Sequence, residues 1–175
     1  MMSMPNNSRL VAMAAVLVLA GCTSKPKTVA EAPPPPAPSS AVQGQVESTV
    51  VPGSVQDFRV NVGDTVHFDY DKYAITSEDR DILQRQAAWL QKYSQVRVSI
   101  EGHCDERGTR EFNLALGARR GNAVKEYLVS LGVSSARMDT ISYGKERPMC
   151  TESNESCWSQ NRRGVTTITS GAATS

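Results

Sequence analysis

The sequence has few aromatic residues, few histidines and almost no excess charge. Only 6% of the 175 residues are Phe, Trp or Tyr, two are histidine, and the formal net charge at pH 7 is +1. A chain this close to neutrality lacks the basic excess with which proteins bind nucleic acid or an anionic membrane surface. His67 and His103, even with Cys104, are too few for a convincing zinc site. We therefore expect no nucleic-acid partner, no metal and no cofactor.

The sequence also lacks an apolar run long enough to span a membrane, which takes about 20 residues. Its longest apolar run, Leu10–Ala20, is short and follows a polar N-terminus with a single Arg, a pattern typical of a secretory signal peptide. The run ends in Leu19-Ala20-Gly21-Cys22, which resembles a lipobox, the signal for diacylglyceryl attachment to the cysteine and cleavage before it. We predict a lipoprotein signal peptide over residues 1–21 and lipidation of Cys22.

Such an anchor is expected to be permanent and to lie in the outer membrane. Stable anchoring takes more than one acyl chain, and bacterial lipoproteins typically carry three, palmitate among them. In sorting systems of the enterobacterial kind, Asp after the lipidated cysteine retains a lipoprotein at the inner membrane, whereas this chain has Thr23. These features predict a lipid-anchored protein of the outer membrane that faces the periplasm.

Residues 22–56 have the composition of a flexible tether. They contain Pro33-Pro34-Pro35-Pro36-Ala37-Pro38, followed by Ser, Ala, Gln and Gly, and every Phe, Trp and Tyr of the chain lies after Gln56. Such a segment buries too little apolar surface to offset its ordering entropy, so we predict a disordered tether with a stiff polyproline part. Residues 57–170 are predicted to form one domain of ordinary size, followed by a tail over 171–175.

Strand and helix patterns alternate along the predicted domain. Apolar residues at every second position predict strands, and apolar residues three and four apart predict helices. The predicted strands cover residues 65–70, 96–101, 138–143 and 165–169, and the predicted helices run from Thr76 to about Leu90, from Thr109 to Leu131, and briefly before Arg162. Such alternation is typical of an α/β or α+β sandwich in which helices pack on one sheet.

The second long helix carries a charge on its apolar face. Arg120 lies one turn after Leu116 and one turn before Val124, so the three share a face, where an unpaired charge is costly. The glycine-containing turn 102–108 offers Asp105 as its partner. The two side chains can form a structural ion pair, or they can clasp a zwitterion, with Asp105 taking the ammonium and Arg120 the carboxylate. Spacing alone favours the ion pair.

Five segments of the predicted domain together resemble one family. The segments are Val66–Asp71, Ile100–Thr109, Asn113–Arg120, Tyr143–Pro148 and Gln160–Arg163. They closely resemble segments of the peptidoglycan-associated lipoproteins, which belong to the OmpA-like C-terminal domain family. The resemblance covers about residues 60–169, in order, and the predicted lipobox and tether complete the same layout. It implies a βαβαβ sandwich of the α+β class, with helices on one face of a mixed sheet of about four strands.

The resemblance also implies a function and a site. The family binds peptidoglycan non-covalently, through the diaminopimelate residue of the stem peptide, without being an enzyme. The Asp and Arg that hold the zwitterionic end of this residue correspond to Asp105 and Arg120. Other positions that line the same groove in the family correspond to Phe68, Asp69, Arg107, Asn113 and Leu116. The implied partners are the Tol system, notably the periplasmic protein TolB, and the implied roles are envelope integrity and constriction during cell division.

The cysteines depart from the family pattern. Cys104 occupies a position that is usually Thr or Ala. Cys150 and Cys157 lie in the loop before the last strand, where many relatives have no cysteine. Because export places them in an oxidising compartment, we predict a local disulfide that pins this loop, with two free thiols as the alternative.

Two other functions compete with wall binding. A hydrolase with a nucleophilic pair of Cys104 and His103 is disfavoured, because adjacent side chains on an extended turn point in different directions and a catalytic triad is assembled from separated residues. A periplasmic module that binds only other proteins, without direct wall contact, is the stronger alternative. In that case Asp105 and Arg120 would be an ion pair and nothing more.

The predicted anchor is testable by one substitution. Cys22→Ser removes the acceptor of the lipid, so the protein should move from the membrane fraction to the soluble fraction on cell fractionation. Retention of the variant in membranes would contradict lipidation at this residue.

Overall fold

The computed structural model describes residues 50–174. The predicted signal peptide, Cys22 and most of the predicted tether lie outside the described residues. Within them, residues 50–56, at the end of the predicted tether, already belong to the folded unit, because Ser54 is buried and forms a bridge with Ala173 of the predicted tail. Both ends of the described part therefore lie together. No helix within residues 50–174 is long and apolar enough to cross a membrane.

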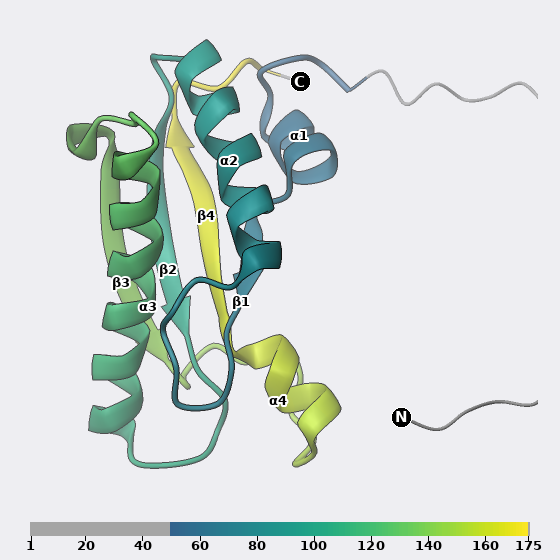
Figure 1. Cartoon of the computed structure of the whole chain (residues 1–175). Coiled ribbons are helices and arrows are strands. Elements are labelled where there is room, and N and C mark those ends of the chain that lie inside the picture. The colour runs from purple at the N-terminus through teal and green to yellow at the C-terminus, as the bar shows by residue number, and fades with distance from the viewer. Residues whose placement is uncertain (1–49, 175) are drawn as a thin grey trace, which may run out of the picture. The chain divides into compact units, whose positions relative to one another are not determined.

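Four strands form one mixed sheet in the order β1-β4-β2-β3 (Figure 1). The strands are β1 (Thr65–His67), β2 (Arg97–His103), β3 (Met138–Gly144) and β4 (Arg163–Ser170). β4 is antiparallel to both β1 and β2, whereas β2 and β3 are parallel and are joined by a helix. The α+β class, the mixed sheet and the number of strands are confirmed.

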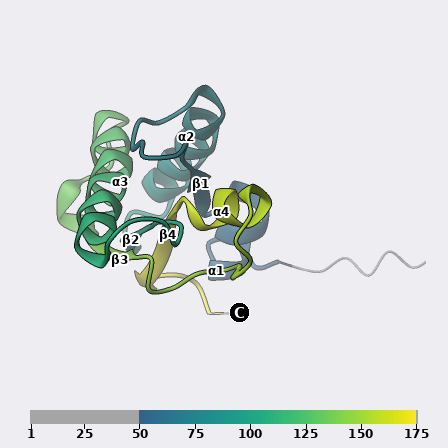
Figure 2. The same cartoon turned by 90° about the horizontal axis from the view of Figure 1, so that it is seen from below.

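Two long helices, α2 (Ser77–Lys92) and α3 (Arg110–Ser130), lie on the same side of the sheet (Figure 2). Thr76 caps α2 in a capping box, in which its side chain and that of Asp79 each bond the other's backbone. Thr109 caps α3 through the backbone N–H of Phe112, and Gly132 follows the helix with a φ of 92°. Both helices thus start and end close to the predicted residues.

The hydrophobic core fills the space between these helices and the sheet. It includes Leu83 and Leu90 of α2, Leu128 of α3, and Val98 and Ile100 of β2, all of which are nearly or fully buried. Since β2 directs every second residue toward the helices, Gly102 follows Val98 and Ile100 on this face.

The backbones of β2 and α3 come very close at Gly102. A Cβ at this position would lie 1.8 Å from the carbonyl oxygen of Gly117 in α3, so only glycine fits. This contact presses the first half of α3 onto the end of β2. It thereby brings the turn after β2 and the apolar face of α3 to one place.

Four shorter helical segments complete the described part of the fold. α1 (Val55–Asp57) runs into a short π-helix, η1 (Phe58–Val62), and the 3₁₀ turn η2 (Ser135–Arg137) precedes β3. The sequence analysis did not predict these three. α4 (Glu155–Asn161) is the predicted short helix before Arg162.

The first strand is shorter than predicted. β1 ends at His67, because β4, its only partner strand, begins its pairing there with Arg163. Phe68 is still buried, but Tyr70 is 59% exposed, and Asp71 has a left-handed backbone with a φ of 55°. The predicted alternation beyond His67 therefore belongs to a loop, which turns back across α3.

Candidate functional site

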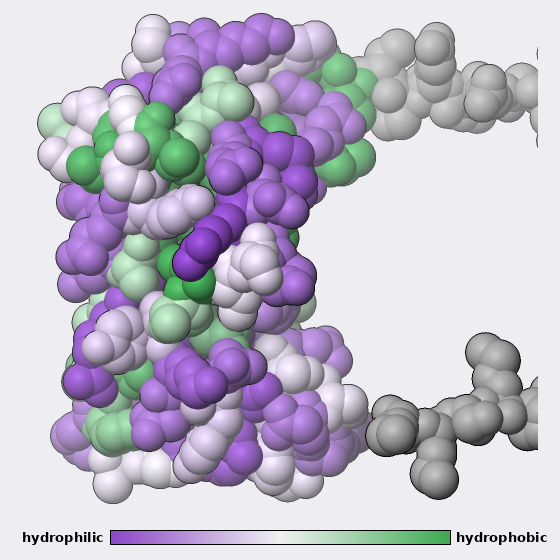
Figure 3. Space-filling model, in the orientation of Figure 1, coloured by the Kyte–Doolittle hydropathy of each residue, from purple (hydrophilic) through white to green (hydrophobic). Residues whose placement is uncertain are grey.

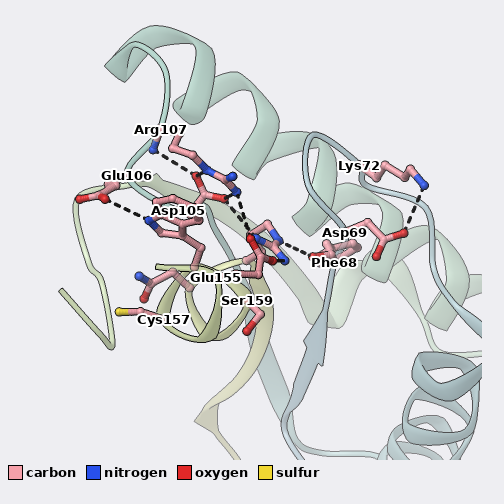
Figure 4. A network of polar contacts seen from close by, with 12 residues as sticks. Phe68, Asp69, Lys72, Asp105, Glu106, Arg107, Glu155, Cys157 and Ser159 are labelled. Carbon is pink, nitrogen blue, oxygen red and sulfur yellow. Dashed lines mark hydrogen bonds and ion pairs between the residues drawn. The ribbon is translucent and has the colours of Figure 1, made fainter. Parts of the chain in front are cut away.

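The predicted site residues lie where four segments meet. These are the loop after β1, the turn that follows β2, the first half of α3, and α4 with the residue that follows it (Figure 4). The close contact of Gly102 with Gly117 holds the second and third of these together. The site therefore rests on the packed sheet and helix, and only its rim consists of loops.

Five of the predicted residues line one small cavity of about 40 Å³. They are Asp105, Arg107, Asn113, Leu116 and Arg120. Tyr70 and Phe112, which are 59% and 44% exposed, stand at its rim. This is far below the roughly 300–1,000 Å³ of a pocket that encloses a drug-sized ligand, so only the end of a larger molecule could enter it.

The other two predicted residues, Phe68 and Asp69, line a larger groove of about 460 Å³ between α2 and α4. In the space-filling view this face is mostly hydrophilic and is hollowed between the two helices (Figure 3). Arg162 also lines the groove and lies 3.5 Å from Asp105. The groove and the cavity are thus neighbours that share a charged wall.

Arg120 is completely buried, and its guanidinium donates hydrogen bonds to three backbone carbonyls. Its Nε donates to Lys72 at 2.8 Å, its Nη1 to His103 at 2.8 Å and its Nη2 to Asp69 at 3.0 Å. Arg120 therefore ties the loop after β1 to the end of β2. Burial lowers the pKa of Arg120, but an arginine side chain keeps its charge in proteins.

The ion pair between Asp105 and Arg120, the alternative to the clasp that spacing alone favours, is absent from the described contacts. Asp105 is instead bound by two other guanidinium groups. Arg107 donates from Nε at 3.1 Å and from Nη2 at 2.6 Å, and Arg162 approaches from the other side. The main-chain N–H of Arg107 also donates to this carboxylate. Asp105 is thus held from several directions (Figure 4).

These contacts set the charge of Asp105. Burial alone would raise its pKa, but the hydrogen bonds from Arg107, the charge of Arg107 and the contact with Arg162 together lower the pKa below its usual range. In return, the bond to Asp105 raises the pKa of Arg107. The carboxylate is therefore ionised at every physiological pH.

Two aromatic rings fix the plane of Arg107. Its guanidinium carbon lies 4.1 Å from the ring centre of Tyr70 and 4.0 Å from that of Trp158. Both distances are in the range of a cation–π contact. Asn113, which is buried, holds the same turn by donating to the carbonyls of Arg107 and Thr109.

The contacts that α4 and the residue after it make with the site were not predicted from the sequence. Arg162 binds Asp105, the carbonyl of Phe68 and the carboxylate of Glu155, while the indole N–H of Trp158 donates to Glu106. Arg162 was part of a segment that resembles the family, but it had no role there. Of its partners, Asp105 and Phe68 are 57 and 94 residues away in sequence, which no local pattern reveals.

Among the described residues, two cysteines form a disulfide and the third is a buried thiol. Cys150 and Cys157 form the predicted disulfide. Cys104 is buried, its Sγ donates to the carbonyl of Asn113, and burial raises the pKa of its thiol. A thiol in this state is a poor nucleophile. Within residues 50–174, no group of three His, Cys, Asp or Glu could hold a metal ion.

The chain is similar in sequence to a known protein family. The family model described as "OmpA family" matches residues 67–162, more than half of the chain. The chain belongs to the OmpA family. It is 51% identical over 170 residues to the peptidoglycan-associated lipoprotein of Mesorhizobium japonicum, covering 97% of this chain and 96% of that protein. It is 49% identical over 168 residues to the protein of the same name from Rhizobium meliloti, covering 96% and 91%.

Two solved structures have a similar fold. The crystal structure of the peptidoglycan-associated lipoprotein from Burkholderia pseudomallei has a TM-score of 0.60 and 40% identity, and the match covers 61% of this chain and 90% of that chain. The C-terminal domain of Helicobacter pylori MotB has a TM-score of 0.57 at 22% identity, over 61% of this chain and 84% of that one. At this identity the second match shows the fold alone.

The buried His103, behind the site, should make the stability of the protein depend on pH in the acid range. Its ring is 98% buried, and neither nitrogen makes a hydrogen bond within the described residues, although Nε2 lies 3.4 Å from Glu101. Burial, aided by the charge of Arg163, lowers the pKa of His103 from 6.5 to about 4. Between these pH values the unfolded chain binds a proton that the folded chain does not. The free energy of unfolding should therefore fall as the pH drops through this range, by roughly 3 kcal/mol in all.

Urea unfolding near pH 7 and near pH 4.5 measures this fall in the free energy of unfolding. Two variants test whether His103 causes it. His103→Gln should remove most of the difference between the two conditions, whereas His67→Gln, at an exposed histidine of β1, should retain it. An equal pH dependence in the wild type and in His103→Gln would show that another group is responsible.

Proposed function

We propose that this protein is an outer-membrane lipoprotein that binds peptidoglycan non-covalently, through the diaminopimelate residue of the stem peptide. One observation carries the proposal. Arg120 is a buried cation at the floor of a cavity, and no carboxylate among the described residues pairs with it. A buried charge without a partner is costly, so a site of this kind favours an anionic ligand group.

The hydrogen-bonding capacity of Arg120 supports a carboxylate as that group. A guanidinium has five N–H groups, and three of those of Arg120 bond backbone carbonyls. One N–H on each terminal nitrogen is left without a protein oxygen among the described residues. Two such groups can bind both oxygens of one carboxylate.

Asp105 supplies the complementary charge for a zwitterion. Its carboxylate is ionised and held in place, and it lines the same cavity as Arg120. The free end of diaminopimelate carries an ammonium and a carboxylate on one carbon, so both charges would find a partner. Because the cavity is so small, only this end would enter, and the exposed side chains of Tyr70 and Phe112 would turn aside to admit it.

The remaining predicted residues would form the walls and the approach. Asn113 and Leu116 line the cavity, Arg107 orients Asp105, and Phe68 and Asp69 line the neighbouring groove, where the rest of the stem peptide would lie. The proposal is binding without catalysis. The buried, bonded thiol of Cys104 does not favour the hydrolase alternative.

The lipid anchor and the tether extend the proposal to the cell envelope. With Cys22 lipidated and a tether over 22–56, the folded part could lie on the order of 100 Å from the membrane, since an extended chain spans about 3.5 Å per residue. One chain would then link outer membrane and wall. The resemblance to the peptidoglycan-associated lipoproteins supports TolB and other Tol proteins as partners, and a role in envelope integrity and in constriction during division.

The alternative is a periplasmic module that binds other proteins without touching the wall. Its simplest form needed Asp105 and Arg120 to neutralise each other. In the structure Asp105 is bound by Arg107 and Arg162, and its charge acts on Arg120 only from beyond ion-pair distance. No carboxylate among the described residues contacts Arg120, and this favours the ligand-binding proposal.

Co-sedimentation of the purified full chain, in mild detergent, with isolated peptidoglycan sacculi tests the proposal. Arg120→Ala would leave three carbonyls without a donor and could unfold the protein, so Arg120→Lys is the sharper variant. A lysine keeps the charge but cannot hold the loop and both oxygens of a carboxylate at once. We expect a loss of binding of about tenfold or more, as for a lost charge-assisted hydrogen bond of about 1.5–3 kcal/mol.

Matched controls are available on neighbouring positions. Arg119→Lys, at an exposed residue next to Arg120, should bind sacculi like the wild type, and thermal unfolding checks that Arg120→Lys is folded. Asp105→Asn should lose binding, whereas Asp139→Asn, at an exposed residue of β3, should not. Full sedimentation of folded Arg120→Lys and Asp105→Asn would contradict the assignment of the site to these two residues.

A further inference from the structure

The helix α4 brings three charged or aromatic groups to the candidate site. Trp158 stacks on Arg107, Arg162 contacts Asp105 directly after the helix, and Glu155 binds Arg162 from the first turn. Ser159, on the same helix, points away from Arg107 (Figure 4). One face of this short helix therefore contacts Asp105 and Arg107, whereas Ser159 lines the neighbouring groove.

The contact of Trp158 with Arg107 determines where Arg107 can point. The guanidinium lies between the rings of Tyr70 and Trp158, and its edge binds Asp105 through two nitrogens. Arginine has a long side chain with many rotamers, so ordering it costs conformational entropy. The two rings reduce this freedom before any ligand arrives, which is the usual origin of gains from preorganisation.

The indole N–H of Trp158 adds a second link. It donates to Glu106 at 3.0 Å, so the ring is tied to the residue between Asp105 and Arg107. The turn that carries Asp105 is thereby held by α4 through a ring face and through a hydrogen bond.

The disulfide fixes α4 to the segment that leads into it. Cys157, in the helix, is bonded to Cys150. At the end of the same helix, Asn161 accepts from the backbone N–H groups of Met149 and Cys150 and donates to the carbonyl of Cys150. Cys150 is thus held at both ends of α4, which closes residues 150–161 into a compact unit next to Trp158.

We propose that Trp158 is a positioning residue, and that the bridge between Cys150 and Cys157 is the clasp that keeps it there. Together they hold Arg107, and through it Asp105, in the orientation that receives the ammonium of the ligand. This inference rests on the proposed function for the ligand. The positioning itself is a property of the free protein and can be measured without ligand.

Two measurements on the full chain in detergent micelles test the inference. The first is NMR of the Nε–H of Arg107, which is protected from exchange with water while it bonds Asp105. In Trp158→Ala this exchange should be at least several-fold faster, whereas Trp158→Phe, which keeps a ring over the guanidinium, should restore most of the protection. The second is calorimetric titration with the tripeptide L-Ala-γ-D-Glu-meso-diaminopimelate, whose affinity should fall about tenfold in Trp158→Ala, a typical value for a partly desolvated cation–π contact.

The clasp has its own variants. The double variant C150S/C157S should show the same two changes as Trp158→Ala. Ser156→Ala, at an exposed residue of α4 that lines neither the cavity nor the groove, should show neither. Thermal unfolding of each variant checks that the domain is intact.

The outcomes separate the two proposals. Unchanged exchange of the Arg107 Nε–H in folded Trp158→Ala would overturn the positioning role, whatever the peptide does. Unchanged exchange and affinity in C150S/C157S would overturn the clasp alone. If Trp158→Ala loosens Arg107 while the wild type fails to bind the tripeptide, the positioning role stands and the proposed ligand is wrong.

Discussion

The structure of the site depends on one buried guanidinium. Arg120 lies on the apolar face of α3 and holds the carbonyls of Asp69, Lys72 and His103. Burying an arginine is costly unless its charge and its donors are satisfied. Three neutral carbonyls satisfy donors, while the charge is offset only from beyond ion-pair distance, by Asp105. The same side chain therefore shapes the fold and is the group that the proposed function assigns to an anion.

The charges around Arg120 are balanced only in part. Arg107 and Arg162 are matched by Asp105 and Glu155, so Arg120 gives this cluster of five a net charge of +1. A ligand that brings only a carboxylate would neutralise it. A zwitterion would in addition place its ammonium beside the ionised Asp105. Under the proposed function, the site would thus select its ligand by charge pattern as well as by the small size of the cavity, about 40 Å³.

The positions of the principal helices and strands could be predicted from the sequence, because they depend on local patterns. The capping Thr76, the two helical stripes and the alternation in β2 all act within a few residues of one another. The end of β1 could not be predicted. Phe68 and Tyr70 continue the alternation, but the loop there is turned by Arg120, which lies about 50 residues further along the chain.

The sequence predicted that Arg120 is buried and needs partners, but not which partners. Backbone carbonyls carry no signature in the sequence, so Asp105 was the only visible candidate. The same limit applies to Trp158 and Arg162, since their contacts with the turn at Asp105 arise only when β4 pairs with β2 and brings α4 alongside. The cysteines were an exception. Export and proximity in sequence were enough to predict the bridge between Cys150 and Cys157.

Chemical change of the ligand tests the central claim most directly, because it leaves the protein untouched. Calorimetric titration would compare the stem tripeptide with a copy in which the carboxylate at the free end of diaminopimelate is amidated. If Arg120 receives that carboxylate, the amide should bind at least tenfold more weakly, as expected for the loss of a charge-assisted, two-point hydrogen bond. Equal affinity of the two peptides would contradict the account.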